Sequence, residues 1–268
     1  MKILNPYIIE LAPTLSQHWY YVWKATPTGK KGKYLGVFPS STTILNAYPQ
    51  SAQLTQWIAE QGWNESQKIK SEAGEDGTLI HKGIEYLLDG GEIIQDGYIP
   101  GSNRMVSLKS YWKLSTFVNW YNEYQPTIIA KEMKIFNKKG GYAGTLDALI
   151  EVRGEIVLVD WKSSSSIHEN FPLQFASYAV AIEQMTDLKI DQTACLQLGA
   201  KNKNGYRYVM YPDWKDHYKV FQNVQATWKY DNFDSKVNAK EAPVLELPSI
   251  LKLSQVSGRD AGDTEITK

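Results

Sequence analysis

Apolar and polar positions along the chain switch between the two-residue period of strands and the longer period of helices. Alternation between 18 and 38, around a Gly- and Lys-rich centre, predicts a β-hairpin with a basic tip. Helical spacing with capping signals predicts helices near 39–45, 54–58, 66–88, 107–124, 170–185 and 213–230. Runs rich in β-branched residues predict strands near 127–136, 142–152, 155–161, 192–199 and 205–211. This order predicts a mixed α/β fold with a central mixed sheet flanked by helices.

Two of these strands, 142–152 and 155–161, are separated by a single turn signal, which predicts a tight hairpin centred on Arg153-Gly154. Residues equidistant from the centre of an antiparallel hairpin lie opposite each other, so Asp147 is expected directly opposite Asp160. Opposed side chains have Cβ atoms roughly 4.5–5.5 Å apart, and like charges at that distance destabilise a sheet. The two carboxylates therefore need a shared proton or a cation between them.

Lys162 lies two residues after Asp160, so the two side chains project from the same face of the strand. An acid-x-Lys triplet is common by itself. The chain contains others that begin at Glu132, Asp187, Asp213 and Asp234. The triplet at Asp213 repeats the letters Asp-Trp-Lys, but it follows a proline and is typical of a helix start. Only the triplet at Asp160 has an opposed carboxylate in this interpretation, and its geometry suits a divalent metal with a lysine beside it.

Two further residues are candidates for the same site. His81 lies on the helix predicted at 66–88. A single helical histidine is more often structural than a ligand, but a neutral imidazole here could complete the coordination offered by the two aspartates. Glu132 faces Asp147 if the loop between their strands runs from 138 to 141, and it faces away if that loop is one residue longer. Glu132 is therefore either a third site carboxylate or a solvated strand residue.

The residues that follow Lys162 have two interpretations each. Ser163 to Ser166 form either a flexible, solvated connection or a set of hydroxyls that contact phosphate, with Ser163 and Ser164 nearest to the lysine. Gln174 and Tyr178 share one face of the next predicted helix, which points to where Lys162 emerges. Amphipathic packing explains Tyr178 about as well as substrate contact does, and the polar Gln174 on the same face favours contact.

Composition restricts the possible functions. The 268 residues include 29 basic and 29 acidic ones, so nucleic-acid binding must come from local grooves and not from bulk attraction. One cysteine excludes a disulfide framework and a cysteine-rich zinc or iron–sulfur site. The first residues resemble neither a signal peptide nor a transit peptide, and no apolar run reaches transmembrane length. We therefore expect a soluble, cytoplasmic protein with no membrane partner and a disordered tail at 254–268.

Four motifs, taken together in this order and spacing, resemble the RecB-type branch of the PD-(D/E)XK nucleases. They are Gly77-Thr78-x-x-His81, Gly144-Thr145-Leu146-Asp147, Asp160-Trp161-Lys162-Ser163-Ser164 and Gln174-x-x-x-Tyr178. The stretch at 39–45 further resembles the single-strand exonucleases of phage and mitochondrial genome-maintenance type. The resemblance covers about residues 37–200 and leaves the N-terminal hairpin and the segment 92–126 unexplained.

The resemblance implies a restriction-endonuclease-like core and a metal-dependent mechanism. Asp147, Asp160 and Lys162 correspond to the two acids and the lysine of the family name. Mg²⁺ or Mn²⁺ would be held by Asp147, Asp160, the Trp161 carbonyl and His81, because oxygen ligands favour these cations over zinc. The metal would lower the pKa of a bound water and neutralise charge on the phosphate.

The resemblance also implies how the substrate is held. Lys162 would orient the attacking water or stabilise the pentacovalent phosphate, and Gln174 and Tyr178 would position the backbone. Some members of this branch hold an iron–sulfur cluster through four cysteines, which is excluded for a chain with Cys195 alone. Proteins bind single strands by stacking aromatic side chains on the bases. Trp19, Tyr20 and Trp23 are the residues to test as such a platform, and the alternative is that they are core residues.

The leading interpretation is a metal-dependent DNA exonuclease that acts on single strands or DNA ends in replication, recombination or repair, in a bacterium or a phage-infected host. Its expected partners are DNA and a recombination or replication protein, and its oligomeric state stays open. The alternatives are a nuclease-fold protein that binds DNA ends or a partner without cutting, and a site-specific endonuclease of the same fold. The expected organisation is an N-terminal elaboration at 1–65, a nuclease core at 66–235 and a C-terminal extension at 236–268.

Overall fold

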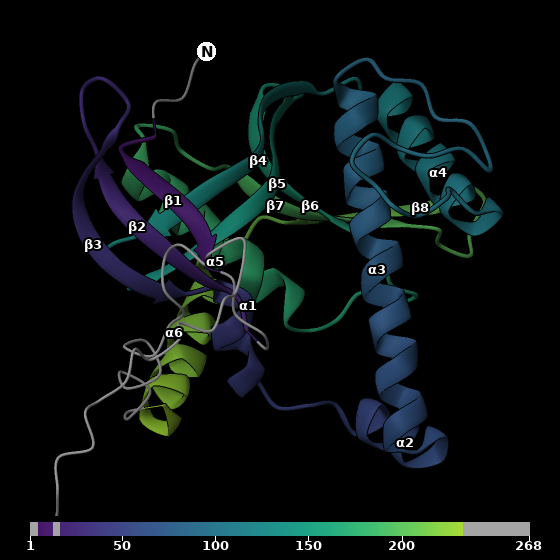
Figure 1. The fold of residues 1–268 in the computed structure, drawn as a ribbon, viewed down its shortest axis with the longest axis horizontal. Helices are drawn as coiled ribbons and strands as arrows, with labels where there is room; N and C mark the ends of the chain where they lie inside the picture. Colours follow the sequence, from purple (N-terminus) through teal and green to yellow (C-terminus); the bar gives the residue numbers. More distant parts are fainter. Residues whose placement is uncertain (1–4, 13–16, 233–268) are drawn as a thin grey trace, which may run out of the picture.

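The computed structural model describes residues 5–12 and 17–232 (Figure 1). Its helices are α1 (Ser41–Ile44), η1 (Leu45–Ala47, a 3₁₀ helix), α2 (Ala52–Gln61), α3 (Trp63–Leu88), α4 (Leu108–Tyr124), α5 (Phe171–Met185) and α6 (Trp214–Asp231). Its strands are β1 (Tyr7–Ala12), β2 (Trp19–Ala25), β3 (Lys31–Pro39), β4 (Thr127–Asn137), β5 (Tyr142–Val152), β6 (Glu155–Lys162), β7 (Gln192–Leu198) and β8 (Tyr206–Tyr211). The extension expected at 236–268, with its tail, lies outside the described residues. Among the residues described, no helix has both the length and the apolar composition needed to cross a bilayer.

Five strands form the central sheet, in the order β4-β5-β6-β7-β8. β6 and β7 run parallel, with α5 in the connection between them, and the other neighbours are antiparallel. A parallel pair requires such a crossover, whereas antiparallel neighbours can be joined by short loops. The fold is therefore mixed α/β with a mixed sheet flanked by helices, as the sequence predicts.

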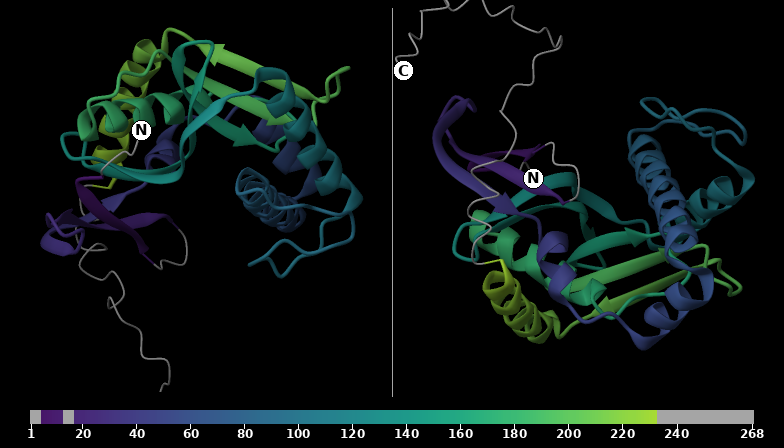
Figure 2. Two further views of the ribbon diagram at one scale, coloured as in Figure 1. Left: turned by 90° about the horizontal axis from the view of Figure 1, so that it is seen from above. Right: turned by 60° about the horizontal axis from the view of Figure 1, so that its bottom comes forward.

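Helices cover both faces of the central sheet, as the two views of Figure 2 show. Successive residues of β6 alternate between two apolar cores. Leu158 packs in the core that includes α5 and α6, whereas Val157 and Val159 pack in the core that includes α3 and α4. This alternation follows the two-residue period of a strand, and burial on both faces explains why the strand is almost continuously apolar.

A second sheet, β1-β2-β3, packs against the central sheet. Tyr20 and Val22 of β2 belong to the same core as Leu146 of β5, and the Tyr20 hydroxyl lies 3.1 Å from the Thr145 hydroxyl. β2 and β3 form the predicted hairpin. β1, which pairs with β2 from Tyr7↔Lys24 to Ala12↔Trp19, was not predicted.

The aromatic residues of β2 serve the packing of the molecule. Tyr20 is 6% and Trp23 8% exposed, and the Trp19 ring packs against the Trp228 ring of α6 with centroids 6.1 Å apart. A platform for stacked bases requires exposed ring faces. The base-platform interpretation is therefore wrong for Tyr20 and Trp23, which are core residues.

Candidate active site

The β5–β6 hairpin has the predicted turn. Arg153 and Gly154 both have a left-handed φ, of 54° and 82°, as the tight turn of a two-residue hairpin requires. The paired residues run from Val152↔Glu155 to Ala148↔Val159. This register is the predicted one. A slip of one residue would turn every apolar side chain of the hairpin to the other face of the sheet.

Asp147 and Asp160 lie one position beyond the last pair of this ladder. Both are buried, with 8% and 2% of their surface exposed. The backbone N–H of Trp161 donates a hydrogen bond to Oδ2 of Asp147 at 2.7 Å. The two carboxylates are therefore held where the backbone pairing of β5 and β6 ends, and one of them ties the strands together through its side chain.

His81 is brought to the same place by α3. Its Nδ1 lies 3.3 Å from Oδ1 of Asp147, and its Nε2 lies 3.1 Å from the carbonyl oxygen of Trp161. This half of α3 is fixed because Ile80 and Ile84 are buried against the sheet. The structure thus brings together three of the predicted metal ligands, His81, Asp147 and the Trp161 carbonyl.

Lys162 projects from the same face of β6 as Asp160, and its Nζ lies 2.5 Å from Oδ1 of Asp160. The ammonium also donates to Oε1 of Gln174 at 3.3 Å, and Nε2 of Gln174 donates to the Tyr178 hydroxyl at 3.0 Å. A Cβ atom on Gly144 would lie 2.6 Å from the Tyr178 ring, so this glycine lets the ring approach β5. Both side chains are buried, so Gln174 holds the ammonium in place and Tyr178 in turn holds Gln174.

Glu132 takes the register that the shorter loop predicts. The pairs on either side, Lys131↔Ala148 and Met133↔Leu146, place it across from Asp147. Its φ of 46° is a left-handed conformation that costs a residue with a side chain roughly 1–2 kcal/mol, and such strain concentrates at functional sites. Glu132, Asp147 and His81 each offer one ligand atom, and these three atoms lie within 4.8 Å of one another. Glu132 is thus a third carboxylate beside the site.

The close charges shift one another's pKa. Burial and then the charge of Asp147 raise the pKa of Asp160 to about 6 and that of Glu132 to about 7. Burial lowers the pKa of His81, but the Asp147 carboxylate outweighs burial and raises that pKa to about 9. For Asp147, burial raises the pKa, and the charges of His81 and Lys162 outweigh it and lower the pKa. The acidic groups of the site therefore require positive charge nearby to stay ionised.

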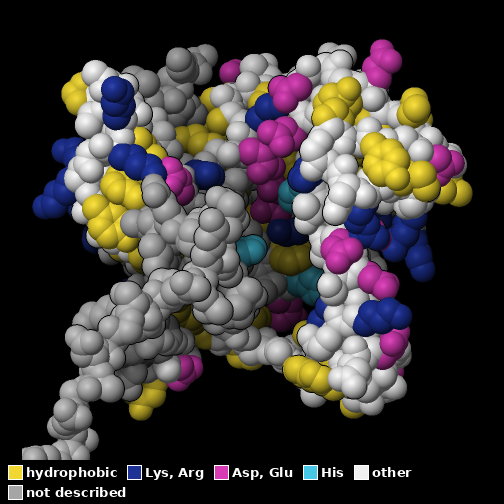
Figure 3. All heavy atoms as spheres, viewed as in Figure 1, with side chains coloured by type: hydrophobic (Ala, Val, Ile, Leu, Met, Phe, Trp, Pro, Cys, Tyr) yellow, Lys and Arg dark blue, Asp and Glu magenta, His cyan; other side chains and the backbone are white. Residues whose placement is uncertain are grey.

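This donor set fits a hard divalent cation. It offers carboxylate oxygens from Glu132 and Asp147, a backbone carbonyl and one imidazole, which suit Mg²⁺ or Mn²⁺ better than a soft metal. The Asp160 carboxylate lies outside this group of close ligand atoms and is paired with Lys162. Figure 3 shows acidic and histidine side chains gathered in the hollow between α3 and the side of the molecule that carries the N-terminal sheet. His81 keeps 32% of its side chain exposed, so a cation could enter from solvent.

The serines after Lys162 lie at the edge of the site. The Ser163 carbonyl accepts a hydrogen bond from Nζ of Lys113 on α4 at 2.5 Å, and the Ser164 carbonyl accepts one from Gln197 at 3.0 Å. These bonds anchor the first half of a segment that the sequence left open as a flexible connection. Lys113 is a neighbour of the site that no motif revealed. Its only sequence signal is that it lies in a stretch without acidic residues.

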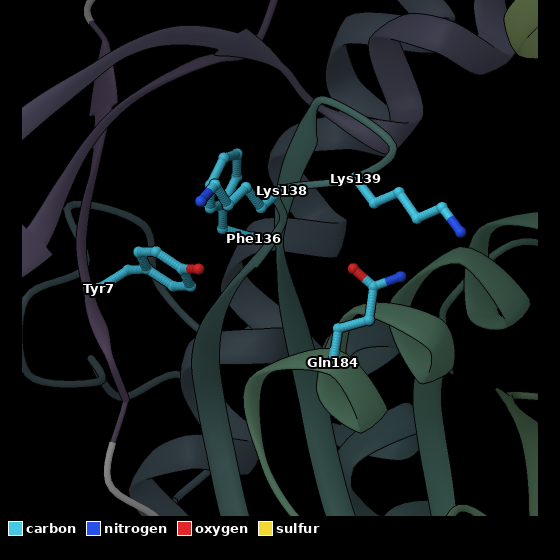
Figure 4. Close-up of a pocket in the computed structure, with 5 residues that line it drawn as sticks. All are labelled: Tyr7, Phe136, Lys138, Lys139 and Gln184. Atoms are coloured by element: carbon cyan, nitrogen blue, oxygen red, sulfur yellow. The ribbon is translucent and has the colours of Figure 1, made fainter.

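A separate pocket lies away from these residues (Figure 4). It has a volume of about 450 Å³ and is lined by Tyr7, Phe136, Lys138, Lys139 and Gln184. The two lysine side chains extend in different directions in Figure 4 and do not converge on a common point. The pocket contains none of the candidate site residues.

A scan against protein-family models and a search of curated proteins give no match. Among solved structures, the chain is similar to a candidate exonuclease from Eubacterium rectale, at 14% identity and a TM-score of 0.42 over 66% of this chain and 76% of that chain. It is also similar to an alkaline exonuclease from Laribacter hongkongensis, at 8% identity and a TM-score of 0.33 over 74% of this chain and 93% of that chain. Scores this low carry no argument about function, which must come from the site itself.

Proposed function

We propose that this protein is a divalent-metal-dependent nuclease that hydrolyses phosphodiester bonds of DNA. The observation that carries the proposal is the convergence of carboxylates from β4 and β5 on His81, beside the buried pair of β6 in which the Lys162 ammonium lies 2.5 Å from Asp160. Buried carboxylates at this spacing need a cation. The lysine adds a fixed positive charge where a phosphate would approach.

The metal, Mg²⁺ or Mn²⁺, would be held by Asp147, Asp160, His81 and the Trp161 carbonyl, with Glu132 as an additional carboxylate. When bound, the metal lowers the pKa of a coordinated water and neutralises charge on the scissile phosphate. The positive φ of Glu132 supports its place in this group, because strained backbone persists where surrounding structure and function require it.

Lys162 is the residue proposed to act on the substrate directly. Its Nζ is held between Asp160 and Gln174 at 2.5 and 3.3 Å, so its position is set before the substrate arrives. An ammonium so placed would orient the attacking water or stabilise the charge that develops on the phosphate. Gln174 and Tyr178 are buried and would not touch the nucleic-acid backbone themselves. They would position it indirectly, by holding Lys162.

The substrate is proposed to be single-stranded DNA or a DNA end, cut as an exonuclease in replication, recombination or repair. This proposal is supported by the resemblance of the four motifs to RecB-type nucleases. The hydroxyls of Ser163 and Ser164 follow Lys162 directly and would contact phosphates next to the reacting one. A recombination or replication protein is the proposed partner.

An oligonucleotide assay tests the proposal. A linear single strand labelled at either end, a duplex and a circular single strand would be incubated with Mg²⁺, Mn²⁺ or EDTA. The expected result is that the linear strand is shortened from an end with either metal and stays intact in EDTA. Asp147→Asn is expected to lower the rate at least about a hundredfold, because it removes negative charge where the metal neutralises the phosphate.

Calorimetric titration with Mn²⁺ gives a second measurement that does not depend on activity. The wild type is expected to bind Mn²⁺, and Asp147→Asn is expected to bind it at least about tenfold more weakly. Cleavage of the circular strand would show an endonuclease in place of an exonuclease. Mn²⁺ binding without cleavage of any polynucleotide would overturn the proposed activity.

A further inference from the structure

The segment that the family resemblance leaves unexplained has an uneven charge. Between 97 and 122 the chain carries three basic residues and no acidic one, whereas the whole chain has equal numbers of the two. The three are Arg104, Lys109 and Lys113. Figure 3 shows Lys and Arg side chains gathered on the α3–α4 side of the central hollow. Arg104 is neutralised by ion pairs with Glu75 and Asp76 of α3, so Lys109 and Lys113 are the cations of this segment that would attract a polyanion.

Two of these cations lie on α4 beside the candidate active site. Lys113 donates to the carbonyl of Ser163, the residue that follows Lys162, at 2.5 Å. Lys109 lies four residues earlier on the same face of α4 and is 71% exposed. Four helical residues span about 6 Å, so the two ammonium groups can meet successive groups of an extended chain. The basic strip therefore begins one residue from the proposed catalytic lysine.

An exposed indole lies in this strip. Trp112 is 45% exposed, whereas Trp120, later on the same helix, is fully buried. A Cβ atom on Gly199 would lie 2.9 Å from the Trp112 ring and 3.0 Å from Cγ of Lys113, so the turn after β7 needs a glycine for both side chains to lie against it. Gly199 also has a φ of 74°, which favours glycine. The ring is thus supported on one side and open on another.

We propose that Lys109, Trp112 and Lys113 form a binding strip for the single-stranded nucleic acid that extends away from the reacting phosphate. The two ammonium groups would contact the backbone, and the indole would stack on a base. Such pairing of cations with an aromatic ring is how proteins hold single strands without reading their sequence. The proposal rests on the nuclease function and names the surface that holds its substrate.

A protein partner is less well matched to this surface. The strip starts at Ser163, next to the Lys162 ammonium that is proposed to meet the scissile phosphate, so a nucleic-acid strand would occupy the strip and the site together. The acidic residue that faces the strip, Asp76 of α3, lies 3.9 Å from Lys109 and 3.5 Å from Arg104. The Asp76 carboxylate weakens the attraction of the strip for a polyanion. Removing its charge should therefore tighten binding, whereas removing a lysine of the strip should weaken it.

Binding of a fluorescent 20-nucleotide oligothymidine, followed by anisotropy in EDTA over a series of salt concentrations, tests the strip without cleavage. Lys109→Gln is expected to weaken binding about two- to fivefold and to reduce the salt slope by about 0.7, because one phosphate contact is lost. Lys219→Gln is the matched control, since Lys219 is also an exposed helical lysine beside an aspartate but lies on α6 at the other end of the molecule (Figure 1). It is expected to leave both quantities unchanged.

Two further variants separate charge from stacking. Trp112→Leu is expected to weaken binding at least about fivefold, and Trp112→Phe is expected to retain most of the affinity because a ring remains. Asp76→Asn is expected to tighten binding about two- to fivefold. Thermal unfolding of each variant shows whether a loss of binding comes from a loss of folded protein.

The outcomes for the strip and for the nuclease activity are distinct. If Lys109→Gln and Trp112→Leu bind the oligonucleotide as tightly as Lys219→Gln does, the strip proposal is wrong even when the protein cuts DNA. If the affinities change in the expected directions while no metal supports cleavage, the proposed activity is wrong and the strip stands. A competing acidic protein that displaces no oligonucleotide from the wild type would support the assignment to nucleic acid. Displacement that is lost in Lys109→Gln would instead assign the surface to an acidic protein partner and overturn the proposal.

Discussion

The tripeptide Asp-Trp-Lys occurs twice in this chain, in opposite surroundings. In β6, Asp160 is 2% exposed and the Lys162 ammonium lies 2.5 Å from its carboxylate. At the start of α6, Asp213 and Lys215 are both exposed, and the Lys215 ammonium lies 5.4 Å from the centroid of the Trp214 ring. The letters are identical, so the difference must come from the backbone that carries them.

The two backbones differ in period. In a strand, residues two apart point to the same face, which brings the acid and the lysine together. In a helix, residues two apart do not face each other, so the same pair separates into solvent. The neighbouring strand β5 also supplies Asp147 beside Asp160, and burial strengthens the interaction of their charges. A short motif therefore has a chemical meaning only in the element that carries it.

The largest expected difference between the two triplets is in activity. Asp160→Asn is expected to lower the cleavage rate about a thousandfold, because it removes a buried carboxylate proposed to hold the metal. Asp213→Asn is expected to stay within about twofold of the wild type, since exposed substitutions away from the site have small effects. Rates on a linear single strand with Mg²⁺ measure both. Equal rates for the two variants would make the site assignment wrong.

The tryptophan in the middle of each triplet is expected to contribute equally to stability, unlike the acid and the lysine on either side of it. Trp161 and Trp214 are each 2% exposed, so both belong to a packed core. Replacing either by alanine is expected to lower the free energy of unfolding by about 3–5 kcal/mol. Urea unfolding of the two variants measures this loss. A neutral result for one of them would show that its triplet is not anchored in the core.

A smaller effect distinguishes positioning from substrate contact. Gln174→Leu removes the amide that accepts from Lys162 and is expected to lower kcat about tenfold with KM nearly unchanged. Lys215→Gln, in the other triplet, is the control and should change neither quantity. If Gln174→Leu instead raises KM and leaves kcat unchanged, Gln174 binds the substrate directly, as the sequence motifs imply.

The β5–β6 hairpin was the best predicted part of the site. Its turn at Arg153-Gly154 and its register agree with the structure because a two-residue turn sets the pairing of everything that follows it. The sequence did not define the length of the longer β4–β5 loop to within one residue, so Glu132 could face Asp147 or point away from it. Loop length, which the pattern of apolar residues does not define to one residue, decided between them.

Other features depended on packing between distant segments. β1 is a strand because its edge pairs with β2. Tyr20 is a core residue because it packs between the two sheets, and Trp23 is buried with Ala12 and Tyr21 on the other face of the N-terminal sheet. None of these facts has a local signal in the sequence. The contact of Lys113 with the Ser163 carbonyl likewise exists only because α4 packs next to the end of β6.

The sequence by itself determined the order of helices and strands from β2 onward, the tight hairpin and the face that Asp160 and Lys162 share. These features follow from turn chemistry and from periods of two and 3.6 residues, which act over a few neighbours. Only the tertiary structure decided that His81, Glu132 and Gln174 meet at that hairpin, and that Trp214 of the second Asp-Trp-Lys is buried while Asp213 and Lys215 stay exposed. Those outcomes come from burial of the sheet between two helical layers, a property of the whole chain that no short stretch of it contains.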